Sequence, residues 1–213
     1  MRFPTARLLI FAKAPRAGRA KTRLIPALGE AGAAALHERL VTHTLATATE
    51  AALCPLQLWC APDTTHPFFE QCKNSAPVTL HQQQGDNLGE RMAYAMQHNL
   101  QQGFNSVIIG TDCPALCAAD LEEAFTHLAH GSDIVIAPAY DGGYVLIGLS
   151  RYSPAPFSDI HWGTDEVLQT TRERIANCQW SLTELNTFQD IDRPEDLPEA
   201  ERLIGPINKL KQA

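Results

Sequence analysis

The alternation of short apolar runs with helical segments is the feature that most restricts the fold of this chain. Residues 7–12 are continuously apolar after Arg7 and run into a loop of Lys, Pro and Gly, which is typical of a buried parallel strand. Further strands are expected at 56–60, 78–81, 106–112 and 133–137, and helices between them at 30–52, 67–73, 88–101 and 120–129. This alternation predicts an α/β fold with three α/β/α layers and a mostly parallel sheet.

The last third of the chain departs from this alternation. Residues 133–137 and 143–149 both have the composition of strands, but the connection between them is too short for a parallel crossover. We therefore expect a late antiparallel insertion, followed by a helix at 164–177, an extended segment at 179–185 and a last helix at 194–203. The tail after Gly205 is expected to be loosely held. No repeat or low-complexity linker interrupts the chain, which predicts a single domain over 1–213.

Charge and cysteine content argue against several classes of protein. The net charge of −7 disfavours general binding to nucleic acid or to an anionic membrane. No apolar stretch is long enough to span a bilayer, and none resembles a signal peptide. The six cysteines form no CxxC pair and have no zinc spacing, so we expect a cytoplasmic protein with reduced thiols.

A cationic loop follows the first expected strand. Five cations lie within residues 13–23, and no acidic residue precedes Glu30. Such cations repel one another unless an anion neutralises them. Ligands of doubly wound sheets bind at the carboxyl ends of the strands. We therefore predict a phosphate site here, although it matches neither GxxxxGK[ST] nor GxGxxG and a solvated basic loop is the alternative. Its predicted contacts are Lys13, Arg16, Gly18, Lys21 and Arg23.

Carboxylates in two later segments predict a metal site. Asp112 ends the most apolar expected strand, where it is well placed to hold a divalent cation that bridges a diphosphate. Asp190 and Asp192 project to one side if their segment is extended. Mg²⁺ or Mn²⁺ held by these three aspartates would offset charge on a leaving phosphate group. Two alternatives stay open, namely Asp112 as a turn residue and Asp192 as the N-cap of the helix that begins at Pro194.

Five collinear segments together resemble one known family. They are KAPRAGRAKTRL (13–24), QGDNLGERM (84–92), GTDCP (110–114), DGGYVLIGL (141–149) and DIDRPEDL (190–197). By these motifs the chain resembles the GT-A-like nucleotide-diphospho-sugar transferases. More closely, it resembles the radical-SAM/selenodomain-associated transferase 1 family, a DUF2064-like group sometimes described as glycosyltransferases. The resemblance implies a nucleotide-binding N-terminal half, a metal ligand at Asp112, and acidic metal ligands near the C-terminus.

The same resemblance implies further site residues. Segment 84–92 is similar to the region that lies over the nucleotide, which makes Gly85, Asp86, Gly89 and Arg91 candidate nucleotide contacts. Segment 141–149 is similar to an acceptor side, with Asp141 as a general base or sugar contact, while a Gly-rich turn without a ligand is the alternative. Lys21 and Asp112 complete the candidate catalytic residues. Trp162 either stacks on a base or sugar ring or is a structural aromatic.

More than one function remains open at this level. We expect a metal-dependent transferase that uses an activated nucleotide and a small-molecule acceptor, and the resemblance favours a glycosyltransferase with a nucleotide-diphospho-sugar donor. The alternative enzyme is a nucleotidylyltransferase that moves NMP from an NTP to a small phosphorylated acid and releases pyrophosphate. A non-catalytic nucleotide-binding or partner-binding protein is the third interpretation. A homodimer is compatible with each of them.

Overall fold

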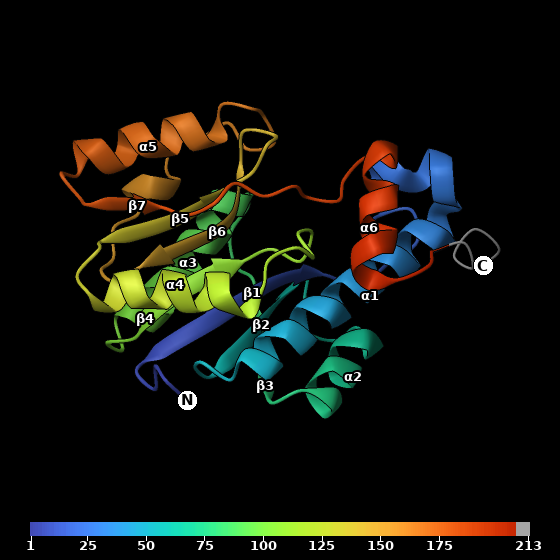
Figure 1. The fold of residues 1–213 in the computed structure, drawn as a ribbon, viewed down its shortest axis with the longest axis horizontal. Coiled ribbons are helices and arrows are strands. Elements are labelled where there is room, and N and C mark those ends of the chain that lie inside the picture. The colour runs from blue at the N-terminus through green and yellow to red at the C-terminus, as the bar shows by residue number, and fades with distance from the viewer. Residues whose placement is uncertain (208–213) are drawn as a thin grey trace.

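The computed structural model describes residues 1–207, which build a seven-stranded sheet in the order β3-β2-β1-β4-β6-β5-β7 (Figure 1). The strands are β1 (Ala6–Lys13), β2 (Leu56–Ala61), β3 (Val78–Gln82), β4 (Asn105–Ile109), β5 (Ile134–Pro138), β6 (Tyr144–Leu149) and β7 (Leu182–Glu184). Neighbouring strands are parallel, except that β6 runs antiparallel to both β4 and β5. The predicted fold class, including the late antiparallel insertion, is confirmed.

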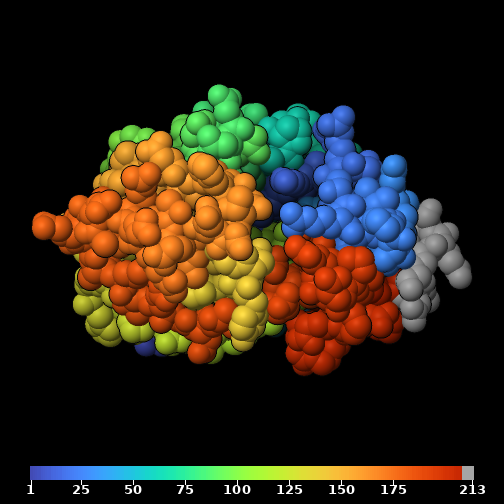
Figure 2. Space-filling model, turned by 90° about the horizontal axis from the view of Figure 1, so that it is seen from above, coloured from blue at the N-terminus to red at the C-terminus, as the bar shows by residue number. Residues whose placement is uncertain are grey.

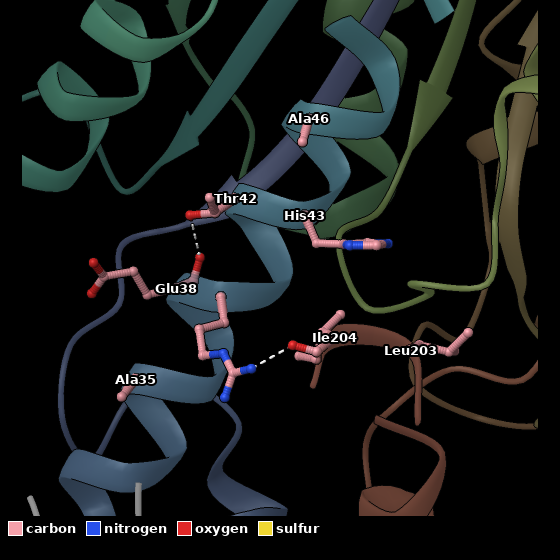
Figure 3. A pocket seen from close by; sticks show the side chains of 8 residues that line it. Ala35, Glu38, Thr42, His43, Ala46, Leu203 and Ile204 are labelled. Atoms are coloured by element: carbon pink, nitrogen blue, oxygen red, sulfur yellow. Dashed lines mark hydrogen bonds between the residues drawn. The ribbon is translucent and has the colours of Figure 1, made fainter. Parts of the chain in front are cut away.

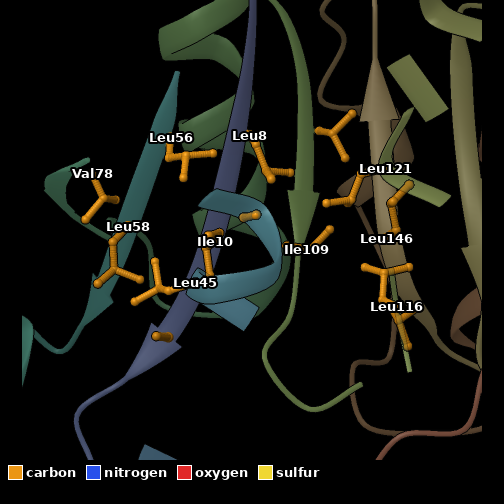
Figure 4. Close-up of a cluster of buried hydrophobic side chains, with 14 of the residues drawn as sticks. Leu8, Ile10, Leu45, Leu56, Leu58, Val78, Ile109, Leu116, Leu121 and Leu146 are labelled. Atoms are coloured by element: carbon orange, nitrogen blue, oxygen red, sulfur yellow. The ribbon is translucent and has the colours of Figure 1, made fainter. Parts of the chain in front are cut away.

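Helices cover both faces of the sheet and complete three layers. They are α1 (Ile25–Ala51), α2 (Pro67–Ser75), α3 (Leu88–Leu100), α4 (Ala118–Ala129), α5 (Val167–Asn177) and α6 (Leu197–Ile204). Side chains of α1, α2 and α4 pack on one face, and those of α3 and α5 on the other. Side chains along β1 alternate between the two faces of the sheet. Leu8 and Ile10 therefore belong to the apolar cluster on the first face (Figure 4), and Leu9 and Phe11 to the cluster on the second. None of the described helices is both long and apolar enough to cross a membrane.

A smaller apolar cluster lies beside the sheet, where α6 packs against the N-terminal half of α1 (Figure 1). Leu24, Leu36 and Ala200 are buried in it together with Ile191 from the segment before α6. Burial of Ile191 anchors this late segment next to the loop between β1 and α1. Residues about 170 positions apart are thereby brought together, as the hydrogen bond from Lys21 Nζ to the carbonyl oxygen of Ile191 shows.

Two predictions about helix and chain ends need correction. The helix expected at 30–52 begins at Ile25, with a break at Gly29, where φ is 73°. The tail prediction is wrong for residues 206–207, because Arg39 donates a hydrogen bond to the carbonyl oxygen of Pro206 (2.7 Å) and Ile207 is buried. The rest of that tail, residues 208–213, lies outside the described part of the chain.

Candidate functional site

The carboxyl ends of the parallel strands meet at one edge of the sheet. From β1 the chain moves outward to β2 and β3 and then returns to add β4 on the other side of β1. Such a reversal leaves a crevice between the two central strands, and Lys13 at the end of β1 and Asp112 after β4 flank it. In Figure 2 the surface is hollowed above the dark blue end of β1, between the blue N-terminal segment and the orange segment that follows β6.

The loop between β1 and α1 presents exposed cations beside this crevice. Lys13, Arg16 and Arg19 are exposed, and no carboxylate within residues 1–207 lies within 4.0 Å of their charged nitrogens. The backbone N–H groups of Arg19 (3.0 Å) and Ala20 (3.1 Å) donate to the carbonyl oxygen of Arg16 and close a turn at Gly18, where φ is 74°. The turn holds repelling charges close together, an arrangement that an anionic ligand would stabilise.

Lys21 in the same loop points inward. Its side chain is 3% exposed, and Nζ lies 3.0 Å from Asp112 Oδ1 and 3.8 Å from Asp192 Oδ1 and donates a hydrogen bond to the carbonyl oxygen of Ile191. Arg23 pairs with the other oxygen of Asp192. Lys21 and Arg23 therefore neutralise carboxylates of the protein itself. This differs from the prediction that both cations are available to phosphate.

Asp112 faces two environments. Its Oδ1 is buried 3.0 Å from Lys21 Nζ, whereas the side chain as a whole is 48% exposed. The exposure therefore lies on the Oδ2 side, toward the crevice. Burial acts to raise the pKa of Asp112, but the charge of Lys21, with smaller effects of His37 and Lys13, outweighs it and holds this pKa below its usual value. Asp112 is thus an ionised carboxylate with one oxygen open to a ligand.

The segment before α6 runs directly beside Asp112. The backbone N–H of Ile191 donates to the carbonyl oxygen of Asp112 at 2.7 Å. Burial raises the pKa of the neighbouring Asp190 to about 6, and the negative charge of Asp141 adds to the effect. A cation bound beside Asp190 would therefore favour the ionised form of this carboxylate.

The interpretation of Asp192 as a helix cap is wrong. The carboxylate of Asp196 accepts hydrogen bonds from the backbone N–H groups of Asp192 (3.0 Å) and Arg193 (2.7 Å), at the start of the 3₁₀ turn Pro194–Asp196 that leads into α6. A carboxylate three residues into a helical turn commonly satisfies the free N–H groups before it. Capping by Asp196 leaves the side chain of Asp192 free to pair with Lys21 and Arg23.

The carboxylates fit a divalent cation only in part. Across residues 1–207, no group of three His, Cys, Asp or Glu side chains is placed to hold a metal ion, so the predicted cluster of three aspartates is not assembled. Asp192 has both oxygens directed at cations. Asp112 and Asp190 do suit a hard cation, because the first has an exposed carboxylate oxygen and the ionised form of the second is disfavoured by burial and by Asp141.

We predict that Asp190→Asn stabilises the metal-free protein at pH 8 and leaves its stability unchanged at pH 4. Because the folded-state pKa of Asp190 is raised to about 6, its ionisation costs stability as the pH rises from about 4 to about 6. With allowance for solvent screening, the gain at pH 8 should be about 1 kcal/mol. Urea unfolding with a chelator measures it, and the exposed Asp86→Asn variant is the control. An equal gain for both variants would contradict the assignment.

The predicted acceptor segment forms the turn between β5 and β6. Asp141 Oδ1 accepts a hydrogen bond from the backbone N–H of Gly143 at 2.9 Å, so Asp141 also has the structural role of a turn residue. Gly142 has φ of 89°, and a Cβ atom there would lie 2.6 Å from Asp165 Cα. Its carbonyl oxygen accepts from Leu168 N at 2.8 Å. The turn is therefore locked to the start of α5.

Segment 84–92 forms the entrance to α3. Asn87 caps the helix by accepting a hydrogen bond from Glu90 N at 3.0 Å, and the carboxylate of Glu90 accepts one from Asp86 N at 2.7 Å. Arg91 Nε donates to the carbonyl oxygen of Gly85 at 2.9 Å. These contacts hold Asp86 and Arg91 at the carboxyl edge, beyond the end of β3.

Gly89 has a different role from the predicted nucleotide contact. It is buried, and a Cβ atom at this position would lie 2.5 Å from the carbonyl oxygen of Phe157 and 2.6 Å from Trp162 Nε1. Close packing against the segment after β6 explains this glycine. The structure thus joins the start of α3 to Trp162, two motifs that the sequence left separate.

His37 is a buried residue at the site that the motifs did not indicate. Its Nε2 donates a hydrogen bond to the carbonyl oxygen of Lys13 at 2.9 Å, and burial lowers its pKa, so the ring is neutral at pH 7. It steadies the end of β1, from which the basic loop departs. His37 is four residues from both Ala33 and Val41, which lie on the apolar face of α1. This spacing is the sequence signal that could have predicted its burial.

A second hollow, of about 550 Å³, lies away from these residues between α1 and α6 (Figure 3). Glu38, Thr42 and His43 line it from α1, and Leu203 and Ile204 from α6. It contains none of the predicted site residues. We therefore assign the candidate site to the crevice at the carboxyl edge.

Comparison with known proteins identifies the family of this chain. The family model described as "Uncharacterized protein conserved in bacteria (DUF2064)" matches residues 44–164. The chain belongs to the DUF2064 family. A solved structure of a candidate nucleotide-diphospho-sugar transferase from Desulfovibrio desulfuricans G20 is 30% identical to this DUF2064 protein, with a TM-score of 0.82 over 95% of this chain and 97% of the other. The resemblance stated from the five motifs is confirmed at the level of family and fold.

More distant structures share the fold of the DUF2064 protein. CMP:2-keto-3-deoxy-manno-octonic acid synthetase in complex with CTP is 12% identical, with a TM-score of 0.60 over 94% of this chain and 98% of that one. 4-Diphosphocytidyl-2C-methyl-D-erythritol synthase is 11% identical, with a TM-score of 0.59 over the same shares of the two chains, 94% and 98%. No curated protein sequence matches significantly.

Proposed function

We propose that this protein is a metal-dependent glycosyltransferase that takes a sugar from a nucleotide-diphospho-sugar and passes it to a hydroxyl group of a small acceptor. The charge arrangement of the basic loop carries the proposal. Lys21 and Arg23 are paired with Asp112 and Asp192, whereas Lys13, Arg16 and Arg19 are exposed and have no carboxylate partner among residues 1–207. Those exposed cations match the charge of a diphosphate at the crevice where open α/β sheets bind ligands.

Each side chain has a defined part in the proposed reaction. Lys13, Arg16 and Arg19 bind the phosphate oxygens, and Lys21 holds Asp112 in place from beneath. Asp112 Oδ2 and Asp190 would hold Mg²⁺ or Mn²⁺, which supplies positive charge opposite the leaving diphosphate. Asp112 flanks the crevice, and Asp190 precedes Ile191, whose N–H donates to the carbonyl oxygen of Asp112, so the charge would be placed beside the donor phosphates.

The transfer balances without another reactant. The acceptor oxygen bonds to the anomeric carbon, the bond from that carbon to the β-phosphate oxygen breaks, and the nucleoside diphosphate leaves with the electron pair. The acceptor proton passes to Asp141, whose Oδ1 is held by Gly143 N and whose second oxygen remains for this purpose. Mutation of Asp141 to Asn should therefore reduce turnover more than donor binding.

Nucleotidylyl transfer is the second candidate, because two distant neighbours are a synthetase crystallised with CTP and a diphosphocytidyl synthase. The same cations would then bind a triphosphate, and the products would include pyrophosphate. The two reactions differ in the bond that breaks, so product analysis separates them. Release of nucleoside diphosphate supports glycosyl transfer, and release of pyrophosphate from an NTP would overturn it.

A thermal-shift panel of nucleoside triphosphates and nucleotide-diphospho-sugars, with and without Mn²⁺, tests donor binding. We expect a sugar nucleotide to give the larger shift, and only with Mn²⁺. Arg16→Ala should weaken its binding about tenfold, because one charge-assisted contact to phosphate is lost. Arg202→Ala removes an arginine that pairs with Glu199 on α6 and should leave affinity within twofold. Equal effects of the two variants would contradict the assigned phosphate site.

A further inference from the structure

A third hollow, a cavity of about 420 Å³, opens between α3 and the segment that follows β6. Its walls are Gly89 and Ala93 on α3 and Phe157, Ile160 and Trp162 on the facing segment. Gly89 is the point where the walls touch, since a Cβ atom there would collide with Phe157 and Trp162. The size of the cavity falls within the range of small-molecule sites.

The cavity lies at the same edge of the sheet as the phosphate crevice. α3 follows β3, so its first turn stands at the carboxyl ends of the parallel strands. Trp162 packs edge-on against Tyr144, with ring centroids 6.3 Å apart, and Tyr144 begins the antiparallel strand β6 at this same edge. In Figure 2 the green segment of α3 and the orange segment after β6 adjoin beside the hollow above β1.

The chemistry of the walls differs from that of the crevice. Among residues 1–207, no Lys or Arg lines the cavity, and its two charged residues there are Glu90 and Asp159. Both carboxylates already have partners, because Glu90 accepts from Asp86 N and Asn87 Nδ2 at 2.7 Å each and Asp159 lies 3.6 Å from Arg174 Nη2. An anion bound here would face these two carboxylates, and Arg174, the cation beside the cavity, already lies against Asp159.

The remaining surface suits an uncharged ring. Phe157 and Trp162 supply aromatic surface, and Ile160 and Ala93 are apolar. Nε1 of Trp162 lies against Gly89, at 2.6 Å from where a Cβ atom would stand, and its N–H has no acceptor within residues 1–207. Apolar ring faces with a few polar groups at the rim are the usual surroundings of a bound small molecule with hydroxyl groups.

We propose that this cavity is the acceptor subsite and that it binds an uncharged, polyhydroxylated ring rather than a phosphorylated or carboxylated acceptor. The proposal rests on the transferase function proposed above and adds the class of acceptor to it. It assigns Trp162 as the residue against which the ring of the acceptor packs. The donor and the acceptor would then bind in regions of different charge, with the donor phosphates at the basic loop and the neutral acceptor across the crevice.

Calorimetric titration of the protein, with nucleoside diphosphate and Mn²⁺ present, tests the proposal. The affinities of methyl glucoside, methyl galactoside and methyl mannoside are compared with those of the corresponding sugar 6-phosphates. We expect at least one neutral glycoside to bind and its 6-phosphate to bind at least tenfold more weakly. Ala93→Leu, which fills the cavity from α3, should weaken glycoside binding at least tenfold. Ala46→Leu places the same side chain in the hollow between α1 and α6 and should leave binding within twofold.

Indole fluorescence gives a second readout. The signal change on glycoside binding should survive Trp180→Phe and disappear with Trp162→Phe, because Trp180 lies outside the cavity and beneath Arg151. Tighter binding of the 6-phosphates, absence of glycoside binding, or equal effects of Ala93→Leu and Ala46→Leu would overturn the subsite. Titration of the glycosides without nucleotide tests the acceptor subsite independently of the donor site. If nucleotides cause no thermal shift, that result contradicts the proposed donor site alone.

Discussion

Lys21→Met is expected to lower the free energy of unfolding by about 2–3 kcal/mol at pH 7.5. This loss is most of what it usually costs to break a buried ion pair by removing one partner. The methionine fills a similar volume but leaves Asp112 Oδ1 buried without the ammonium that lies 3.0 Å away in the native chain. It also removes the hydrogen bond to the carbonyl oxygen of Ile191. The loss is placed below the full cost for a buried pair because Asp112 is half exposed.

The effect should depend on pH in a defined direction. Lys21 holds the pKa of Asp112 below its usual value, so the stabilisation is present above the unfolded-state pKa near 4 and is lost as the pH falls through the lower folded-state pKa. The difference between native and variant protein should therefore shrink toward low pH. Urea unfolding at pH 7.5 and at successively lower pH measures it.

Two further variants test the cause. Adding Asp112→Asn to Lys21→Met should recover part of the loss, because an amide is cheaper to bury than an unpaired carboxylate. Arg23→Met removes a cation that is 59% exposed and also contacts Asp192, and it should cost less than about 1 kcal/mol. A loss for Lys21→Met no larger than that for Arg23→Met would contradict the buried ion pair.

Gly142→Ala is expected to cost about 3–4 kcal/mol, from backbone strain at positive φ together with overpacking. At φ of 89° an L-residue is strained, and the new Cβ atom would overlap the backbone of Asp165, which cannot move aside as a flexible side chain could. The overlap should also displace Asp141 and the start of α5. The midpoint temperature of thermal unfolding and the donor-dependent turnover should both decrease.

Gly163→Ala is the matched control for this variant. Gly163 has φ of 87°, nearly the same conformation, and a Cβ atom there would meet nothing within 4 Å. Its substitution should therefore cost only the strain of about 1–2 kcal/mol. The difference between the two variants isolates the close approach of the β5–β6 turn to Asp165, and equal losses would show that this approach is not required.

The sequence by itself determined the α/β class, the antiparallel insertion and the position of the basic loop. Each follows from local information, since apolar runs such as 7–12 identify buried strands and a short connection forces the antiparallel pair. The loop follows β1, and a loop in that place lies at the carboxyl edge in any open sheet with parallel strands.

Only the tertiary structure decided how the charges are paired. Lys21 and Asp192 are 171 positions apart, and their contact depends on the burial of Ile191 between α1 and α6. The same is true of Gly89, whose role is explained by Phe157 and Trp162 from a distant segment. A run of basic residues predicts an anion site but does not say which cations the protein's own carboxylates occupy, because Coulomb attraction depends on distances that packing sets.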